Sequence, residues 1–73
     1  MNRKRKIYRM RKFIRTYGII TEEYKRPPEP FYPKGSYFVN FQSERLDMNC
    51  CVGHIDKYQA YKSIIDIIKE YTK

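Results

Sequence analysis

Residues 36–52, SYFVNFQSERLDMNCCV, contain the pattern that decides the fold. Side chains alternate along residues 36–42, with Tyr37, Val39 and Phe41 on one face. The opposite face carries Phe38, Asn40 and Gln42. Residues 43–47, SERLD, are typical of a turn, and a second alternating run follows with Met48, Cys50 and Val52 on one side. Two such runs joined by a short turn predict an antiparallel hairpin.

The segment that follows the hairpin, residues 56–73, predicts a helix. Asp56 suits the N-cap position, and Gln59 three residues later completes a capping-box pattern. Apolar side chains recur at helical spacing and form one stripe, with Ile67 beside it: Tyr58, Tyr61, Ile64, Ile65, Ile68 and Tyr71. We expect this helix to pack on the sheet through four of them, Tyr61, Ile64, Ile65 and Ile68.

The segment before the hairpin predicts a short strand and then a loop. Residues 19–25, IITEEYK, begin with β-branched residues, which favour a strand. With the two strands of the hairpin, we therefore expect a sheet of two or three strands. Residues 26–33, RPPEPFYP, hold four prolines, which lack an amide donor and disfavour helix before them. The two P-x-x-P spacings there could serve an SH3 domain, but Arg26 and Lys34 each miss the required offset by one. A Pro-rich loop over residues 26–34 is favoured.

The N-terminal segment, residues 1–17, predicts a basic helix. Apolar residues recur at helical spacing, at Ile7, Met10, Phe13 or Ile14, and Tyr17. Gly18 stands where a C-cap glycine is expected, and we expect residues 6–17 to be helical, at least when bound, and residues 1–5 to be frayed. This segment carries eight cations and no acid. The rest of the chain then has 16 − 8 = 8 cations and all 8 acids, so a basic arm, 1–17, precedes a neutral domain, 18–73. The fold class is α+β.

The basic arm is the strongest functional signal, because Lys and Arg side chains neutralise phosphates and release counterions. The candidate phosphate-binding residues are Arg3, Lys4, Arg5, Lys6, Arg9, Arg11, Lys12 and Arg15. Tyr8 and Phe13 lie among them, where their rings could stack on unpaired bases. The alternatives are a merely solvated helix, an acidic protein groove, an anionic lipid surface, a nuclear localisation signal in NRKRK, and an Arg-rich mitochondrial presequence.

A second candidate surface is the face of the hairpin that carries Phe38, Asn40 and Gln42. These side chains could contact bases or form another interface if the face is open. Phe38 could instead pack under the first helix, and this interpretation is favoured.

Catalysis and metal binding are not predicted. Cys50 and Cys51 are neighbours on a strand, so their side chains point to opposite faces and cannot easily share an ion with His54. We expect both cysteines to be buried strand residues, and no cofactor. With a single histidine and no nucleophile-elbow or phosphate-loop pattern, the chain is predicted not to be an enzyme. The lack of a disulfide framework indicates a reducing compartment, the cytoplasm. No stretch approaches the roughly 20 apolar residues of a membrane span.

Two resemblances add to this interpretation. Residues 53–61, GHIDKYQAY, follow two strands and resemble the strand–helix junction of the AP2-type and integrase-arm DNA-binding fold, with Gly53 and Asp56 matching. Lys57 replaces the usual Thr there, and Ala60 comes one position early. That family implies three strands backed by one helix, with the sheet in the major groove, here offering Phe38, Asn40, Gln42 and Arg45.

The size and the charge layout are also similar to those of small phage-encoded anti-CRISPR proteins. The abundance of Ile, Lys and Tyr fits an AT-rich genome, such as that of a phage or mobile element. The sequence therefore predicts a nucleic-acid-binding accessory protein. The alternative is a phage-encoded inhibitor that binds a nucleic-acid-processing enzyme and blocks its channel or active site.

Overall fold

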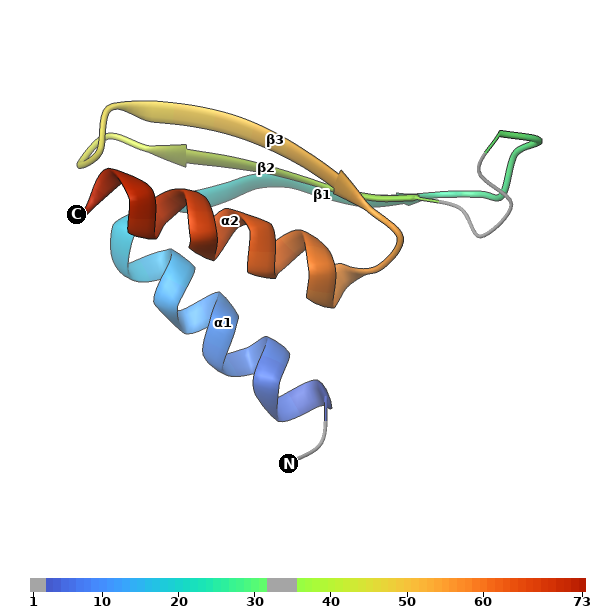
Figure 1. Cartoon of the computed structure of the whole chain (residues 1–73), viewed down its shortest axis with the longest axis horizontal. Helices are drawn as coiled ribbons and strands as arrows, with labels where there is room; N and C mark the ends of the chain where they lie inside the picture. Colours follow the sequence, from blue (N-terminus) through green and yellow to red (C-terminus); the bar gives the residue numbers. More distant parts are fainter. Residues whose placement is uncertain (1–2, 32–35) are drawn as a thin grey trace.

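The computed structural model describes residues 3–31 and 36–73. Its elements are, in chain order, α1 (Arg3–Tyr17), β1 (Ile19–Arg26), β2 (Ser36–Ser43), β3 (Met48–His54) and α2 (Lys57–Tyr71). The strands form one antiparallel sheet in the order β1-β2-β3, and both helices lie on the same side of it (Figure 1). The predicted α+β fold is confirmed, and the sheet has three strands.

The hydrophobic core lies between the sheet and α2. Tyr61, Ile64 and Ile68 of α2 have no exposed surface, and they pack with Val39 and Phe41 of β2. The predicted contact stripe of α2 is thus confirmed in its centre, whereas Tyr71 in the last turn is 58% exposed. The predicted N-cap is also confirmed, because the Asp56 carboxylate accepts a hydrogen bond of 2.9 Å from the Gln59 N–H.

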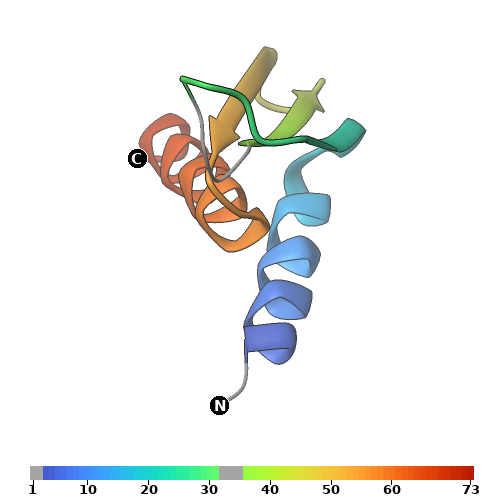
Figure 2. The same cartoon turned by 90° about the vertical axis from the view of Figure 1, so that its right-hand side faces the viewer.

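Helix α1 packs beside α2, and its N-terminal half extends away from the sheet (Figure 2). It begins at Arg3, so the expectation of a frayed segment is wrong for residues 3–5, while residues 1–2 lie outside the described residues. The Arg3 guanidinium bonds the Asp56 carboxylate at 2.9 Å and lies 5.1 Å from the Tyr58 ring centroid. These contacts hold the first turn of α1 against the start of α2.

The junction between α1 and β1 requires a glycine. The Gly18 N–H bonds the Ile14 carbonyl at 3.1 Å and closes the helix, but its φ lies outside the left-handed region. A Cβ at Gly18 would lie 2.3 Å from the Gln42 carbonyl oxygen and 2.8 Å from the Phe41 ring. The glycine is therefore needed for the close approach of two backbone segments, rather than for a special dihedral angle.

The turn between β2 and β3 is tied to the end of α1. The buried Ser43 hydroxyl donates to the Tyr17 carbonyl at 2.5 Å and accepts from the Leu46 N–H at 3.0 Å. Asp47 closes the turn with φ 51°, a left-handed value that Asp tolerates.

The ends of two strands differ slightly from the predicted ones. Strand β3 continues to His54, two residues beyond the predicted end. The predicted Pro-rich loop is described over residues 27–31, because Arg26 ends β1 and residues 32–35 lie outside the described residues.

Candidate functional site

One side of α1 presents an exposed row of cations, which we call the outer face of α1. Its four cations follow one another at steps of three or four residues and so share one side of the helix, with Tyr8 among them: Arg5, Arg9, Lys12 and Arg15. All five side chains are exposed, and the helix from Arg3 to Tyr17 contains no acid. Tyr8 is 62% exposed, and the Lys12 ammonium lies 5.2 Å from its ring centroid.

The other residues of the predicted phosphate-binding set have different surroundings. Lys4 and Lys6 are exposed. Arg3 is paired with Asp56, and Arg11 lies 3.9 Å from the Glu23 carboxylate and is half-buried. Phe13 is half-buried and packs against the Tyr17 ring, with their centroids 5.3 Å apart. The predicted set thus contains exposed cations as well as Arg3 and Arg11, which pair with acids of the neutral domain.

Glu23 organises a polar cluster that sequence analysis missed. Its carboxylate accepts hydrogen bonds from the hydroxyls of Tyr37 and of Tyr61, the latter at 2.8 Å. The Lys57 ammonium lies 3.3 Å from the same oxygen, and Arg11 approaches the other oxygen. We call these five residues the Glu23 cluster. They come from α1, β1, β2 and α2, so the cluster joins four elements of the fold.

Burial and hydrogen bonding within the Glu23 cluster shift the pKa values of Glu23, Tyr37 and Tyr61. Burial by itself would raise the pKa of Glu23, but hydrogen bonds from Tyr37, Tyr61 and Lys57 outweigh it and lower the pKa. Burial, and then the hydrogen bond to Glu23, raise the pKa values of Tyr37 and Tyr61. Glu23 therefore stays ionised and both tyrosines stay protonated at neutral pH, so their hydrogen bonds link β1 to β2 and α2.

Glu23 reaches the core because of an irregularity in β1. The register shifts between Ile20 and Glu22, so Ile20 pairs with Phe41 and Glu23 with Val39. Both partners belong to the helix-covered face of β2, and simple alternation would have placed Glu23 on the other face. The extra residue, Thr21, bonds the Asn40 carbonyl through its hydroxyl at 3.3 Å.

The other side of the sheet is not covered by any element of the described residues (Figures 1 and 2). We call this side the open sheet face. Its side chains in the three strands include Tyr24 and Arg26, then Phe38, Asn40 and Gln42, then Asn49 and Cys51. The prediction that Phe38 packs under the first helix is wrong, because β2 turns its even-numbered residues away from both helices.

Phe38 belongs to an aromatic pair on the open sheet face. Tyr24 stacks on Phe38 with a centroid distance of 5.3 Å and an interplanar angle of 20°, and Tyr24 is 41% exposed. The Arg26 guanidinium lies 5.6 Å from the Phe38 centroid. On the other side the ring covers Gly53, where a Cβ would come within 2.7 Å of it.

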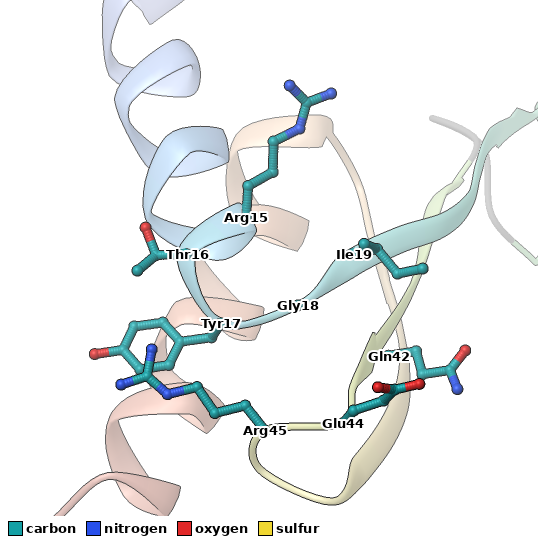
Figure 3. Close-up of a pocket in the computed structure, with 8 residues that line it drawn as sticks. All are labelled: Arg15, Thr16, Tyr17, Gly18, Ile19, Gln42, Glu44 and Arg45. Carbon is teal, nitrogen blue, oxygen red and sulfur yellow. The ribbon is translucent and has the colours of Figure 1, made fainter.

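The surface has two hollows, one on the open sheet face and one at the end of α1. A hollow of about 430 Å³ on the open sheet face is lined by polar side chains that include Thr21, Asn40, Gln42 and Asn49. A second, of about 540 Å³, lies at the α1–β1 junction, where Gly18 separates Tyr17 and Arg45 from Ile19 and Gln42 (Figure 3). Arg15 also lines it, and the Arg45 guanidinium lies 4.9 Å from the Tyr17 centroid. Gln42 borders both hollows.

The cysteines and the histidine do not converge. Cys50 is half-buried on the helix side, whereas Cys51 is exposed on the open sheet face, so the expectation that both are buried is wrong for Cys51. The His54 ring bonds the Ser63 hydroxyl at 2.6 Å, a link between β3 and α2. Residues 3–31 and 36–73 contain no cluster of three metal-ligating side chains, and neither described helix is long and apolar enough to cross a membrane.

Comparison with known proteins does not assign this architecture to a family. No protein-family model matches the chain, and neither does any curated protein or solved structure. The resemblance to the AP2-type fold therefore stays a prediction from residues 53–61. The candidate site is defined by its own geometry, as the outer face of α1 and the open sheet face, which are joined where Arg15 and Gln42 line the same hollow.

Proposed function

We propose that this protein binds nucleic acid, with the outer face of α1 contacting the phosphates. The observation that carries the proposal is the division of the basic residues of α1. Arg3 and Arg11 pair with Asp56 and Glu23, whereas Arg9, Lys12 and Arg15 are exposed together on the other side of the helix.

A row of exposed cations on an ordered helix suits a phosphate backbone. The outer face of α1 extends from position 5 to position 15, about 15 Å along the axis at ~1.5 Å per residue. Arg side chains can donate two parallel hydrogen bonds to one phosphate, and Lys binds as a point charge. Ile14 is fully buried in the core and holds the helix against the neutral domain, so the exposed cations are presented without the cost of ordering a flexible arm.

A salt titration of binding tests the proposal. Four cations on the outer face give an expected log–log slope of about −4 on duplex DNA, at ~0.9 per phosphate contact. The double variant Arg9→Ala/Lys12→Ala should lose two of these contacts and reduce the slope to about −2. The matched control, Lys62→Ala/Lys69→Ala, removes the same charge from exposed positions of α2 and should keep the wild-type slope.

The result also separates this proposal from the alternative of an enzyme inhibitor. Equal effects of the two double variants would show that total charge, and not the outer face of α1, determines binding. If duplex DNA, single-stranded DNA and RNA all bind weakly and with the same salt dependence, the proposal fails. The outer face of α1 would then be directed at an acidic protein surface, such as that of a nucleic-acid-processing enzyme.

A further inference from the structure

The open sheet face carries side chains that the packing of the protein does not require. Phe38 covers Gly53, and a ring placed over a glycine on a neighbouring strand stabilises a sheet by itself. That role does not account for Tyr24, which stacks on the far side of Phe38 and keeps 41% of its surface exposed. It also does not account for Arg26 beside the rings or for the amide side chains that follow along β2.

We infer that the open sheet face binds the unpaired bases of a single-stranded nucleic acid whose phosphates contact α1. The inference rests on the proposed function and names its ligand. Bases inside a duplex are stacked on each other and do not present their faces, so an aromatic platform on a sheet selects unpaired nucleotides. The exposed Tyr24 ring offers such a platform, with the Arg26 cation close to it.

The hollow on the open sheet face, which begins at Asn40, two residues along β2 from Phe38, supplies groups that can bond base edges. Asn40, Gln42 and Asn49 line it, and each amide group has both donors and an acceptor. The Asn40 amide donates one hydrogen bond of 3.1 Å to the Glu22 carboxylate, which leaves its carbonyl oxygen and its second N–H for a ligand. Stacking at Tyr24 and hydrogen bonding at Asn40 can therefore act on successive bases.

The open sheet face connects with the basic helix through Gln42. Gln42 lines the hollow on the open sheet face and also the hollow at the α1–β1 junction, where Arg15 and Arg45 are found. From Gln42 to Phe38 the path along β2 is about 13 Å, at ~3.3 Å per residue. Glu22 lies beside this path, opposite Asn40, so the bases are expected there and not the phosphates. The phosphates are expected at the two ends, at Arg26 and at the pair Arg15 and Arg45, whose two positive charges exceed the charge of Glu44 in the same hollow.

The test compares two fluorescent strands of equal length, a short single-stranded DNA and the same backbone without bases. The wild-type protein should bind the strand with bases about tenfold more tightly, since one stacked base contributes a factor of this order. Tyr24→Leu removes a ring at an exposed position and should abolish this preference, with an unchanged melting temperature. The control Tyr71→Leu removes a ring of similar exposure from α2 and should keep it. An RNA strand of the same sequence should behave like the DNA strand.

The double variant Arg9→Ala/Lys12→Ala distinguishes failure of this inference from failure of the proposed function. It should weaken binding of both strands by the same factor, because both have the same phosphates. If the wild-type protein binds both strands equally, or if Tyr24→Leu retains the preference, the inference is overturned while the role of α1 stands. If the wild-type protein binds neither strand nor duplex DNA, the proposed function fails and the inference fails with it.

Discussion

Replacement of Glu23 by Gln should destabilise the fold, because Glu23 of β1 is bonded to tyrosines of β2 and α2. The carboxylate accepts hydrogen bonds from two tyrosine hydroxyls, and it faces Lys57 and Arg11. A hydrogen bond to a charged group contributes about 1.5–3 kcal/mol, compared with about 1 kcal/mol for a neutral pair. A glutamine keeps the shape but makes both bonds neutral, so the loss for two bonds is about 2 kcal/mol. Lys57 and Arg11 are partly exposed and add little.

The matched control for this change is Glu22→Gln. This substitution removes the same charge at the neighbouring residue. Glu22 is exposed on the open sheet face and accepts one hydrogen bond from Asn40. Thermal unfolding followed by circular dichroism should show a melting temperature about 8–16 °C lower for Glu23→Gln, at ~4–8 °C per kcal/mol for a domain of this size. Glu22→Gln should change it by less than about 4 °C. Equal effects of the two variants would refute the reasoning.

The same substitution gives a prediction for pH. The pKa of Glu23 is lowered in the folded state, so its contribution is fully present above the ordinary value of 4.5 and is lost as the pH falls through the folded-state pKa. Protonated Glu23 resembles glutamine. The difference in melting temperature between the wild-type protein and Glu23→Gln should therefore be full at neutral pH and shrink in acid. A difference that persists after Glu23 is protonated would contradict the role assigned to its charge.

Two further predictions concern packing. Gly18→Ala should destabilise the fold by about 2–3 kcal/mol in urea unfolding, because its Cβ would overlap a backbone carbonyl, whereas Gly53→Ala should cost less because the Phe38 ring can move. A larger loss for Gly53→Ala would contradict this. Tyr61→Ala should cost about 3 kcal/mol or more, and the exposed Tyr71→Ala less than about 1 kcal/mol; similar melting temperatures would show that the helix faces are wrongly assigned.

Regular periodicity explains which elements could be predicted from the sequence. Strand β2 and helix α2 have one apolar face each, so their existence and their contact follow from the alternation of residues 36–42 and from the stripe around Tyr61. The N-cap at Asp56 is a local feature of a few residues, and it was predicted for the same reason. The cationic side of α1 also follows from spacing, since eight cations and four apolar positions leave little choice of face.

The sequence could not predict which cations form ion pairs, because their partners lie far away in the chain. Arg3 pairs with Asp56, 53 positions later, and this contact extends α1 to residues that we expected to be frayed. Arg11 meets Glu23 because α1 and the side chain of Glu23 lie on the same side of the sheet. Sequence spacing shows which cations share a helix face, but it does not show which of them find an acid.

The sequence by itself determined the α+β class, the order of the elements, the core face of α2 and a basic α1, since each depends on local periodicity and composition. The tertiary structure alone decided which side of the sheet is covered and which residues of β1 face the core. One extra residue at Thr21 shifts the register and turns Glu23 inward, and the placement of both helices on one side leaves Phe38 and Tyr24 on the open sheet face. Both outcomes result from contacts between distant segments, which no local pattern records.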